Sequence, residues 1–139
     1  MKLSAKATYR PRMSSGQFMD AVITPGARAA VQAACTTIQQ RAQELAPVDT
    51  GALRDSITVE IDDSGKTVVG TVGPHVDYAA YVEFGTGKAG ASSAGAGAGP
   101  YNPDWPGMPA QPYMRPAYDE VKPQIIDLFR SQIATQLKT

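Results

Sequence analysis

The chain has 139 residues, a length typical of a single domain. Thirteen Lys and Arg residues balance thirteen Asp and Glu residues, and this net charge of zero argues against a strongly basic nucleic-acid binder and an acidic solvating tail. The only cysteine is Cys35 and the only histidine is His75, which excludes an internal disulfide and a zinc site built from several cysteines. We therefore expect neither a metal nor a cofactor.

Residues 1–12 carry four basic side chains but no apolar run, so they do not resemble a secretory signal. No stretch approaches the roughly 18 apolar residues that a membrane-spanning helix needs. We expect a soluble protein of the reducing cytoplasm, or one assembled there, that has no membrane partner.

Residues 1–20 show no regular hydrophobic period, and Pro11 and Gly16 interrupt them. We expect an N-terminal arm here, followed by a single domain over residues 21–139. Two interpretations of the arm remain open, a frayed terminus or an arm that docks on a neighbouring subunit. The candidate anchors are Met13, Phe18 and Met19. The scattered basic residues have no platform of several aromatic residues between them and give little indication of phosphate binding.

A helix is predicted to begin at Thr24-Pro25-Gly26, because threonine suits the N-cap and proline suits the first helical position. Apolar residues then recur at gaps of three and four, which places them on one face. They are Ala27, Val31, Ala34, Ile38, Ala42 and Leu45. Pro47 ends the helix, because a proline disfavours helix at the residue before it. Cys35 lies beside this face and is expected to be a small buried apolar side chain.

Residues 56–73 predict a β-hairpin. From Ser56 to Asp62, isoleucine and valine alternate with polar residues, as in a half-buried strand. Asp63-Ser64-Gly65 supplies turn residues, and the chain returns over Thr67–Val72. A lone hairpin is only marginally stable in water. We therefore expect the hairpin to pack on the first helix or to pair with further strands, including strands of another subunit.

Residues 77–84 predict a short amphipathic helix with Gly85 as its C-cap. The segment 85–112 that follows is rich in glycine and alanine, a composition that buries too little surface to offset the entropy of ordering. We expect a flexible loop that is mobile in the free subunit. Its single tryptophan, Trp105, is either a contact residue for a partner or a clamp at the base of the loop.

Pro116 fits the first position of a final helix, whose apolar residues again fall at helical spacing. They are Tyr118, Val121, Ile125, Leu128, Phe129, Ile133 and Leu137. Pro123 should kink or restart this helix. The order of elements predicts an α+β fold, in which two main α-helices pack on a small antiparallel sheet that contains the β-hairpin. A short helix and a long Gly-rich loop complete it.

The string Asp49-Thr50-Gly51 matches the catalytic triplet of aspartic proteases, in which two aspartates share a proton. Val68-Val69-Gly70 resembles a second element of that family. The context disagrees, because the triplet follows a helix and not a hydrophobic strand, and the second element belongs to the hairpin. The alternative is a capped turn in which Asp49 or Thr50 accepts hydrogen bonds from backbone N–H groups before Leu53. We favour the turn.

Two weaker patterns also suggest chemistry. Gly85-Thr86-Gly87-Lys88 lacks the glycine and the Ser or Thr that a phosphate-binding loop requires at fixed distances, so nucleotide binding is not expected. His75, Asp77 and Glu83 resemble an acid–base group, but we expect Glu83 to form an ion pair with an arginine instead. The candidate partners are Arg54 and Arg115.

Three strings together are typical of a known family. They are Ala46–Ile57, Tyr78–Thr86 and Gln111–Ala117. In this order, around a hairpin and between two helices, they resemble the neck or tail-completion family of long-tailed bacteriophages, typified by gene product ten of phage HK-ninety-seven. The resemblance runs from about Thr24 to the C-terminus, and the N-terminal arm and the Gly/Ala-rich insertion lie outside it.

The resemblance implies a structural virion protein that forms a homo-oligomeric ring at the neck, the head–tail junction, after assembly in the host cytoplasm. Its implied neighbours are a head-closure (stopper) or adaptor protein and the tail-terminator or tail-tube proteins, with DNA passing through the channel without specific binding. The family implies no catalytic residue. The alternatives are another tail-end component, such as a tail terminator or tail-tube protein, and a retropepsin-like aspartic protease.

Large rigid rings bury area at a low entropic cost, so Tyr78, Tyr81 and Phe84 are candidate interface anchors, with core packing as the alternative. A ring also requires a heterologous interface that closes. The structural and interface candidates are Asp49, Thr50, Gly51, Leu53, Arg54, Tyr78, Tyr81, Glu83, Phe84, Gly85, Trp105, Met114, Arg115 and Pro116.

Overall fold

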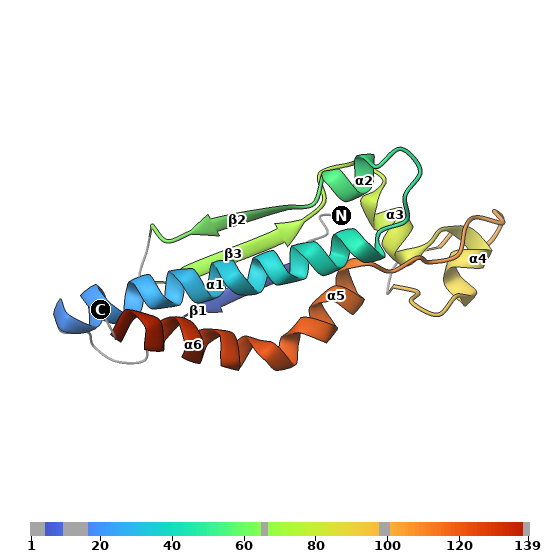
Figure 1. The fold of residues 1–139 in the computed structure, drawn as a ribbon. Coiled ribbons are helices and arrows are strands. Elements are labelled where there is room, and N and C mark those ends of the chain that lie inside the picture. Colours follow the sequence, from blue (N-terminus) through green and yellow to red (C-terminus); the bar gives the residue numbers. More distant parts are fainter. Residues whose placement is uncertain (1–4, 10–16, 65–66, 98–100, 138–139) are drawn as a thin grey trace.

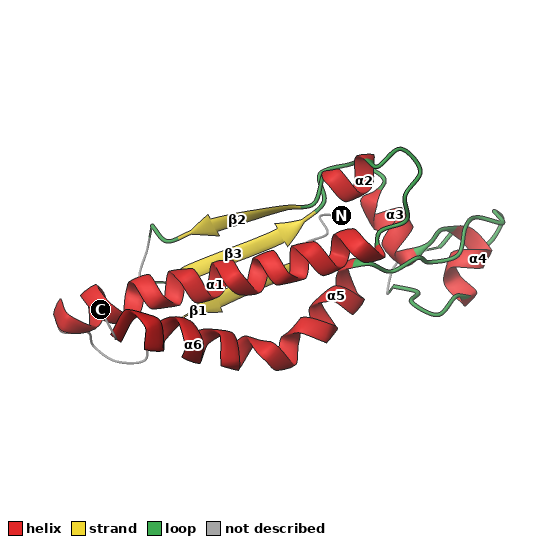
Figure 2. Ribbon diagram, viewed as in Figure 1, coloured by secondary structure: helices red, strands yellow, loops and turns green. Residues whose placement is uncertain are grey.

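Helix α1 (Gln17–Leu45) is the longest element and the centre of the fold. The structure is a computed structural model that describes residues 5–9, 17–64, 67–97 and 101–137. Figure 1 shows α1 lying across one face of a small sheet, with the C-terminal helices running back beside it. Figure 2 separates the same arrangement into helices and strands. The α+β fold predicted from the sequence is confirmed, with two longer helices packed against an antiparallel sheet.

The buried face of α1 is made mostly of small side chains at the predicted spacing. Its buried residues are Ala27, Ala30, Val31, Ala34, Cys35, Ile38 and Ala42. Leu45, which the same pattern included, is only half-buried against the core. Burial raises the pKa of the Cys35 thiol to about 11, so the thiol stays protonated at neutral pH. It therefore packs as the apolar side chain that the sequence predicted.

The helix begins at Gln17, so the prediction that Thr24-Pro25-Gly26 opens it is wrong. A proline inside a helix removes one backbone hydrogen bond. The continuous apolar face from Ala27 onward, packed on the sheet, outweighs that loss. The other end is as predicted, because α1 ends at Leu45 and Pro47 follows.

The hairpin predicted over residues 56–73 is confirmed as strands β2 (Thr58–Asp62) and β3 (Val68–Gly73), which pair antiparallel. Along β2, exposed polar residues alternate with the half-buried Val59 and Ile61. Before the turn, the Asp62 side chain accepts a hydrogen bond of 3.0 Å from the backbone N–H of Ser64. Residues 65–66 of the turn lie outside the described residues.

A third strand, β1 (Ala5–Tyr9), lies within the segment that we expected to form an arm without a core. It pairs antiparallel with β3 of the same chain, which gives the strand order β1-β3-β2. The physical reason is that a two-stranded hairpin leaves one edge of β3 without hydrogen-bond partners, and β1 satisfies that edge. Of the proposed arm anchors, Phe18 and Met19 lie in α1, and Met13 lies outside the described residues.

Gly70 in the middle of β3 allows α1 to lie close to the sheet. A Cβ atom added to this glycine would overlap the Cys35 Sγ atom and would stand 2.6 Å from Val31 Cγ1. The contact between sheet and helix is therefore closest where neither element carries a large side chain.

The C-terminal region forms α5 (Met114–Val121), the 3-10 turn η1 (Lys122–Gln124) and α6 (Ile125–Leu137). The predicted interruption at Pro123 is confirmed, since this proline lies inside η1. Pro116 is the third residue of α5 and not the first, as we had predicted. Proline is tolerated there because N–H groups of the first turn have no partner within the helix.

An ion pair joins the two long helical segments, because Arg41 of α1 binds both carboxylate oxygens of Glu120 in α5, with Nη2 at 3.2 Å from Oε1. The hydrogen bond from Arg41 holds the pKa of Glu120 below its ordinary value of 4.5. A carboxylate whose pKa is lowered by folding contributes stability above its unfolded pKa and loses that contribution as the pH falls.

Replacing Glu120 by glutamine is therefore expected to destabilise the protein more at neutral pH than at pH values below 4.5. Urea unfolding of the wild type and of Glu120→Gln at both pH values measures this difference. The same destabilisation at the two pH values would contradict the assignment of this pair as a pH-dependent contact. Glu44, an exposed neighbour of Arg41, provides the Glu44→Gln control.

The Gly/Ala-rich segment contains more regular structure than its composition predicted. Residues Gly87–Ser92 form helix α4, and Thr86 forms an antiparallel bridge with Met108. Backbone hydrogen bonds between the two parts of the segment, such as Thr86 N to Met108 O at 2.8 Å, offset part of the entropy of ordering. Mobility of this segment in the free subunit stays a prediction, and residues 98–100 lie outside the described residues.

Candidate functional site

Glu83 is the one buried charged residue among the described side chains, with no exposed surface. It lies in the short helix α3 (Ala79–Phe84), between the more exposed Val82 and Phe84. A carboxylate without contact to water is strongly unfavourable unless hydrogen bonds and a positive charge compensate it. Its surroundings must therefore supply several donors.

Those donors come from the first turn of α5. The Glu83 carboxylate accepts hydrogen bonds from the backbone N–H groups of Tyr113 at 2.7 Å, Met114 at 3.0 Å and Arg115 at 3.0 Å. The next residue, Pro116, has no N–H group, and Ala117 makes the first bond inside the helix, to Tyr113 O at 3.4 Å.

The first four N–H groups of a helix lack partners within it. In α5 one carboxylate from another element accepts three of them, and a proline removes the fourth. The negative charge also lies at the positive end of the helix dipole, which stabilises it further. Glu83 thus acts as a cap for a helix that begins about thirty residues later in the chain.

Arg115 supplies the compensating positive charge. Its Nε atom lies 3.2 Å from Glu83 Oε1, its Nη2 donates to the carbonyl of Gly95, and its guanidinium stands 4.7 Å from the centre of the Phe84 ring. The prediction that Glu83 pairs with an arginine is confirmed for Arg115. Arg54, the other candidate, binds its neighbour Asp55 instead.

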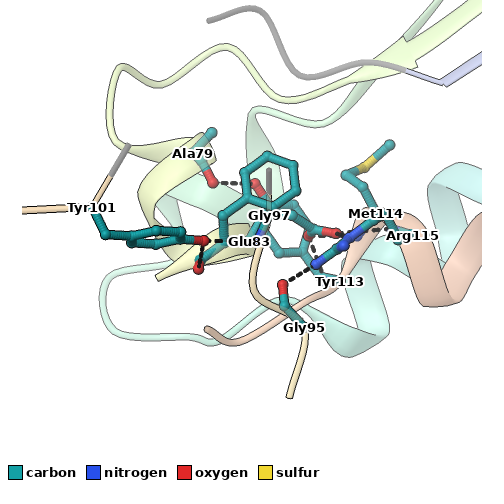
Figure 3. A network of polar contacts seen from close by, with 9 residues as sticks. Ala79, Glu83, Gly95, Gly97, Tyr101, Tyr113, Met114 and Arg115 are labelled. Atoms are coloured by element: carbon teal, nitrogen blue, oxygen red, sulfur yellow. Dashed lines mark hydrogen bonds and ion pairs between the residues drawn. The ribbon is translucent and has the colours of Figure 1, made fainter. Parts of the chain in front are cut away.

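A second bond ties the same two helices together, because the Tyr113 hydroxyl donates to the Ala79 carbonyl at 3.0 Å. Tyr113 is completely buried, and burial, followed by the charge of Glu83, raises the pKa of its hydroxyl well above the ordinary value. Figure 3 shows Glu83 and Arg115 side by side, with Tyr113 beneath them. We call the contacts of Glu83, Tyr113 and Arg115 between α3 and α5 the polar joint.

Hydrogen bonds next to the polar joint close the base of the Gly/Ala-rich segment. Tyr101, within that segment, donates its hydroxyl hydrogen to the Phe84 carbonyl at 2.9 Å and accepts from the Gly97 N–H at 2.7 Å, as Figure 3 shows. Gln111 N donates to Val82 O at 2.8 Å. Since both ends of the segment are bound to α3, it projects from the molecule as a closed loop (Figure 1).

The first of the three strings forms the turn between α1 and the sheet. The Thr50 hydroxyl accepts a hydrogen bond of 3.3 Å from the Ala52 N–H, and Gly51, at φ 87°, is the N-cap of helix α2 (Ala52–Asp55). The capped-turn alternative is therefore confirmed through Thr50, while Asp49 is exposed. Leu53 is buried in the core cluster that also contains Tyr113, so the strings meet at one end of the core.

The two elements of the protease motif play different parts in the fold. Asp49 lies in the exposed turn before α2, whereas Val68, Val69 and Gly70 belong to β3, the central strand of the sheet. Because β3 is paired on both sides, its residues are held within the sheet and not beneath a catalytic loop.

The proposed acid–base group does not assemble either. The His75 ring lies 2.7 Å from the Thr58 hydroxyl, and its backbone N–H donates to Ser56 Oγ at 3.1 Å. The Glu83 carboxylate instead accepts hydrogen bonds from backbone N–H groups at the start of α5. The contacts of His75 fix the linker between β3 and α3, whereas Glu83 has no exposed surface.

Of the aromatic interface candidates, Tyr78, Tyr81 and Trp105 are available at the surface, with exposed fractions of 45%, 60% and 53%. Phe84 is half-buried beneath Arg115, and Met114 is buried in the core. The structure therefore separates three surface rings from two residues that stabilise the fold.

Two further features of the described part of the chain concern metal binding and membrane spanning. There, His, Cys, Asp and Glu form no group of three or more that could hold a metal ion. Within the same residues, no helix combines the length and the apolar character that crossing a membrane requires.

Comparison with protein families gives a match over the part of the chain from α1 to α3. Residues 20–85 match the family model described as "Bacteriophage HK97-gp10, putative tail-component". Over these residues the chain is similar to the HK97-gp10-like family. The match includes Glu83 and Gly85 but not the third string, residues 111–117, so the resemblance that we expected to reach the C-terminus is supported over the shorter range. No curated protein and no solved structure shows a significant match.

The HK97-gp10-like family is one of phage tail components, that is, structural parts of the virion. Sequence reasoning named Glu83 and Arg115 but missed Tyr101 and Tyr113, whose hydroxyls complete the contacts. The signal for Tyr101 was its position, as the first aromatic residue after a long run of small residues.

Proposed function

We propose that this protein forms a homo-oligomeric ring at the head–tail junction of a long-tailed phage, where it completes the neck by joining the head-side connector to the tail. Its partners are further copies of itself, a head-closure or adaptor protein, and the tail-terminator or tail-tube proteins. DNA passes through the ring without specific binding. The protein has no catalytic role.

The match of residues 20–85 to a family of phage tail components carries this proposal. The chemistry of the chain supports it, since the one buried carboxylate among the described residues caps a helix and has no exposed surface. The exposed Tyr78, Tyr81 and Trp105 provide large apolar contacts of the kind that are enriched in protein–protein interfaces.

Interrupting the gene in its phage is expected to produce filled heads and complete tails that do not join. Electron microscopy of the lysate measures this directly, and plasmid-borne wild-type protein should restore joined particles. An absence of tail tubes, or tubes of uncontrolled length, would assign the chain to the tail tube or the tail terminator instead.

The matched control is Asp49→Asn, which removes the only carboxylate of the protease-like triplet from an exposed turn. This variant is expected to restore joined particles as well as the wild type does. Failure of a folded Asp49→Asn protein to restore them would contradict a purely structural role and revive the protease alternative.

A further inference from the structure

The sheet and the helical layer of this molecule are offset from each other. The strand order β1-β3-β2 places β1 and β2 at opposite edges of the sheet. Helix α1 packs on the strands, and α6 packs on α1. Figure 1 shows α6 along the side of the molecule opposite to β2, which has no second helix beside it. Helix α1 is therefore the member of the helical layer that packs on β2.

The side chains of β2 agree with this arrangement. Val59 and Ile61 contact the core but remain half-buried, and Thr58, Glu60 and Asp62 are exposed. A strand at the edge of a sheet also presents unpaired N–H and C=O groups, which form a template for pairing with another chain. The β2 edge thus combines free backbone groups with incompletely covered aliphatic side chains.

The opposite edge contains a basic residue at the matching register position. Lys6 in β1 and Glu60 in β2 are both register partners of Thr71 in β3, so they stand at the same level on the two edges. The sequence at the end of β2 contains the acidic residues Glu60, Asp62 and Asp63.

Glu60 is the acidic residue best placed to meet a second chain. Asp62 accepts hydrogen bonds from Ser64, and Asp63 forms an ion pair of 2.7 Å with Arg28. Glu60 is exposed and lies in the middle of the β2 edge, away from the turn. Of these three carboxylates, Glu60 is therefore the best placed to pair with a basic residue on a neighbouring strand.

We propose that copies of this chain associate head to tail, with the β2 edge of one copy against the β1 edge of the next. β1 and β2 run in the same direction, because each is antiparallel to β3. Copies related by rotation about a ring axis then form a parallel contact that brings Lys6 of one copy near Glu60 of the next.

The same contact would also extend the helical layer, because it would bring α6 of the neighbouring copy to the side of β2, where Val59 and Ile61 are half-buried. It uses two different surfaces of the chain, which is the heterologous geometry from which rings close. The inference rests on the proposed function, since it supplies the interface of the proposed ring.

Charge reversal tests this interface. Purified full-length protein is examined by native mass spectrometry and analytical ultracentrifugation over a range of concentrations at low and high salt. Wild-type protein should form oligomers that weaken as salt screens the charges. Glu60→Lys and Lys6→Glu, each alone, place like charges opposite each other and should weaken association at least about tenfold.

Mixing equal amounts of the two single variants provides the decisive measurement. In a head-to-tail ring that alternates the variants, every contact again joins opposite charges, so oligomers should reappear with both variants in alternation. Asp104→Lys is the matched control, because it makes the same change of charge in the projecting loop and should leave association unchanged. Circular dichroism verifies that each variant is folded.

Three results would overturn the interface: wild-type protein that stays monomeric throughout, a Glu60→Lys variant that associates like the wild type, or a mixture that fails to recover oligomers. None of them alone overturns the proposed function, which the gene interruption tests independently. Unjoined heads and tails together with a failed charge test would keep the neck role and assign the ring contact to other surfaces.

Discussion

Replacing Glu83 by alanine is expected to lower the free energy of unfolding by about 3–5 kcal/mol, because it leaves three backbone N–H groups without an acceptor and each buried donor without a partner costs about 1–3 kcal/mol. The carboxylate has no exposed surface and accepts three backbone N–H groups of α5. Without it, these donors have no partner and the nearby Arg115 has no counter-charge. Urea unfolding monitored by circular dichroism measures the change.

Glu83→Gln separates the charge from the shape of the side chain. The amide keeps one oxygen acceptor, but its NH2 group faces backbone donors, so we expect a smaller loss of about 2 kcal/mol. The control is Glu44→Ala, an exposed glutamate in an ion pair of α1, which should change the free energy of unfolding by less than about 1 kcal/mol. Equal effects of Glu83→Ala and Glu44→Ala would show that the polar joint does not stabilise the fold.

Replacing Gly85 by alanine is expected to be the second most damaging change, with a loss of about 2–5 kcal/mol from backbone strain and overpacking together. Gly85 has φ 76° and ψ 179°, a region that residues with a Cβ atom rarely adopt. The added Cβ would stand 2.6 Å from Ala110 N and 2.7 Å from both Gly90 Cα and Met108 O. All three are backbone atoms, so the rotation of a side chain cannot relieve the overlap.

The damage from Gly85→Ala should concentrate in the closed loop. Limited proteolysis is therefore expected to cleave the variant faster within residues 86–112 than the wild type, in addition to the shift in urea unfolding. Ala94→Ser adds one side-chain atom at an exposed position of the same segment and serves as the control. If the two variants resist protease equally, the tight contact at Gly85 does not hold the loop.

The elements with a strong local period could be predicted from the sequence. The small-residue face of α1, the alternation along β2 and the interruption at Pro123 all appear where the pattern placed them. Each depends on the spacing of neighbouring residues, which the chain encodes locally. The turn at Thr50 and Gly51 was also correctly separated from its protease-like alternative, because the preceding helix was recognisable.

The start of α1, strand β1 and the order within the Gly/Ala-rich segment were not predicted. β1 is only five residues long, and what stabilises it is the unpaired edge of β3, far along the chain. The segment is ordered by contacts between its two ends, such as those of Thr86 with Met108, which composition does not reveal. In each case the decisive partner is distant in sequence.

The sequence by itself determined the fold class, the hairpin, the buried face of α1 from Ala27 to Ala42 and the likeness to a phage tail-component family. It also indicated that Glu83 needs an arginine. Only the tertiary structure decided that this carboxylate caps α5, that Pro116 removes the remaining donor, and that the loop is closed at its base. The physical reason is that a buried charge is stabilised by whichever donors the folded chain brings to it, and donors thirty residues away leave no periodic trace in the sequence.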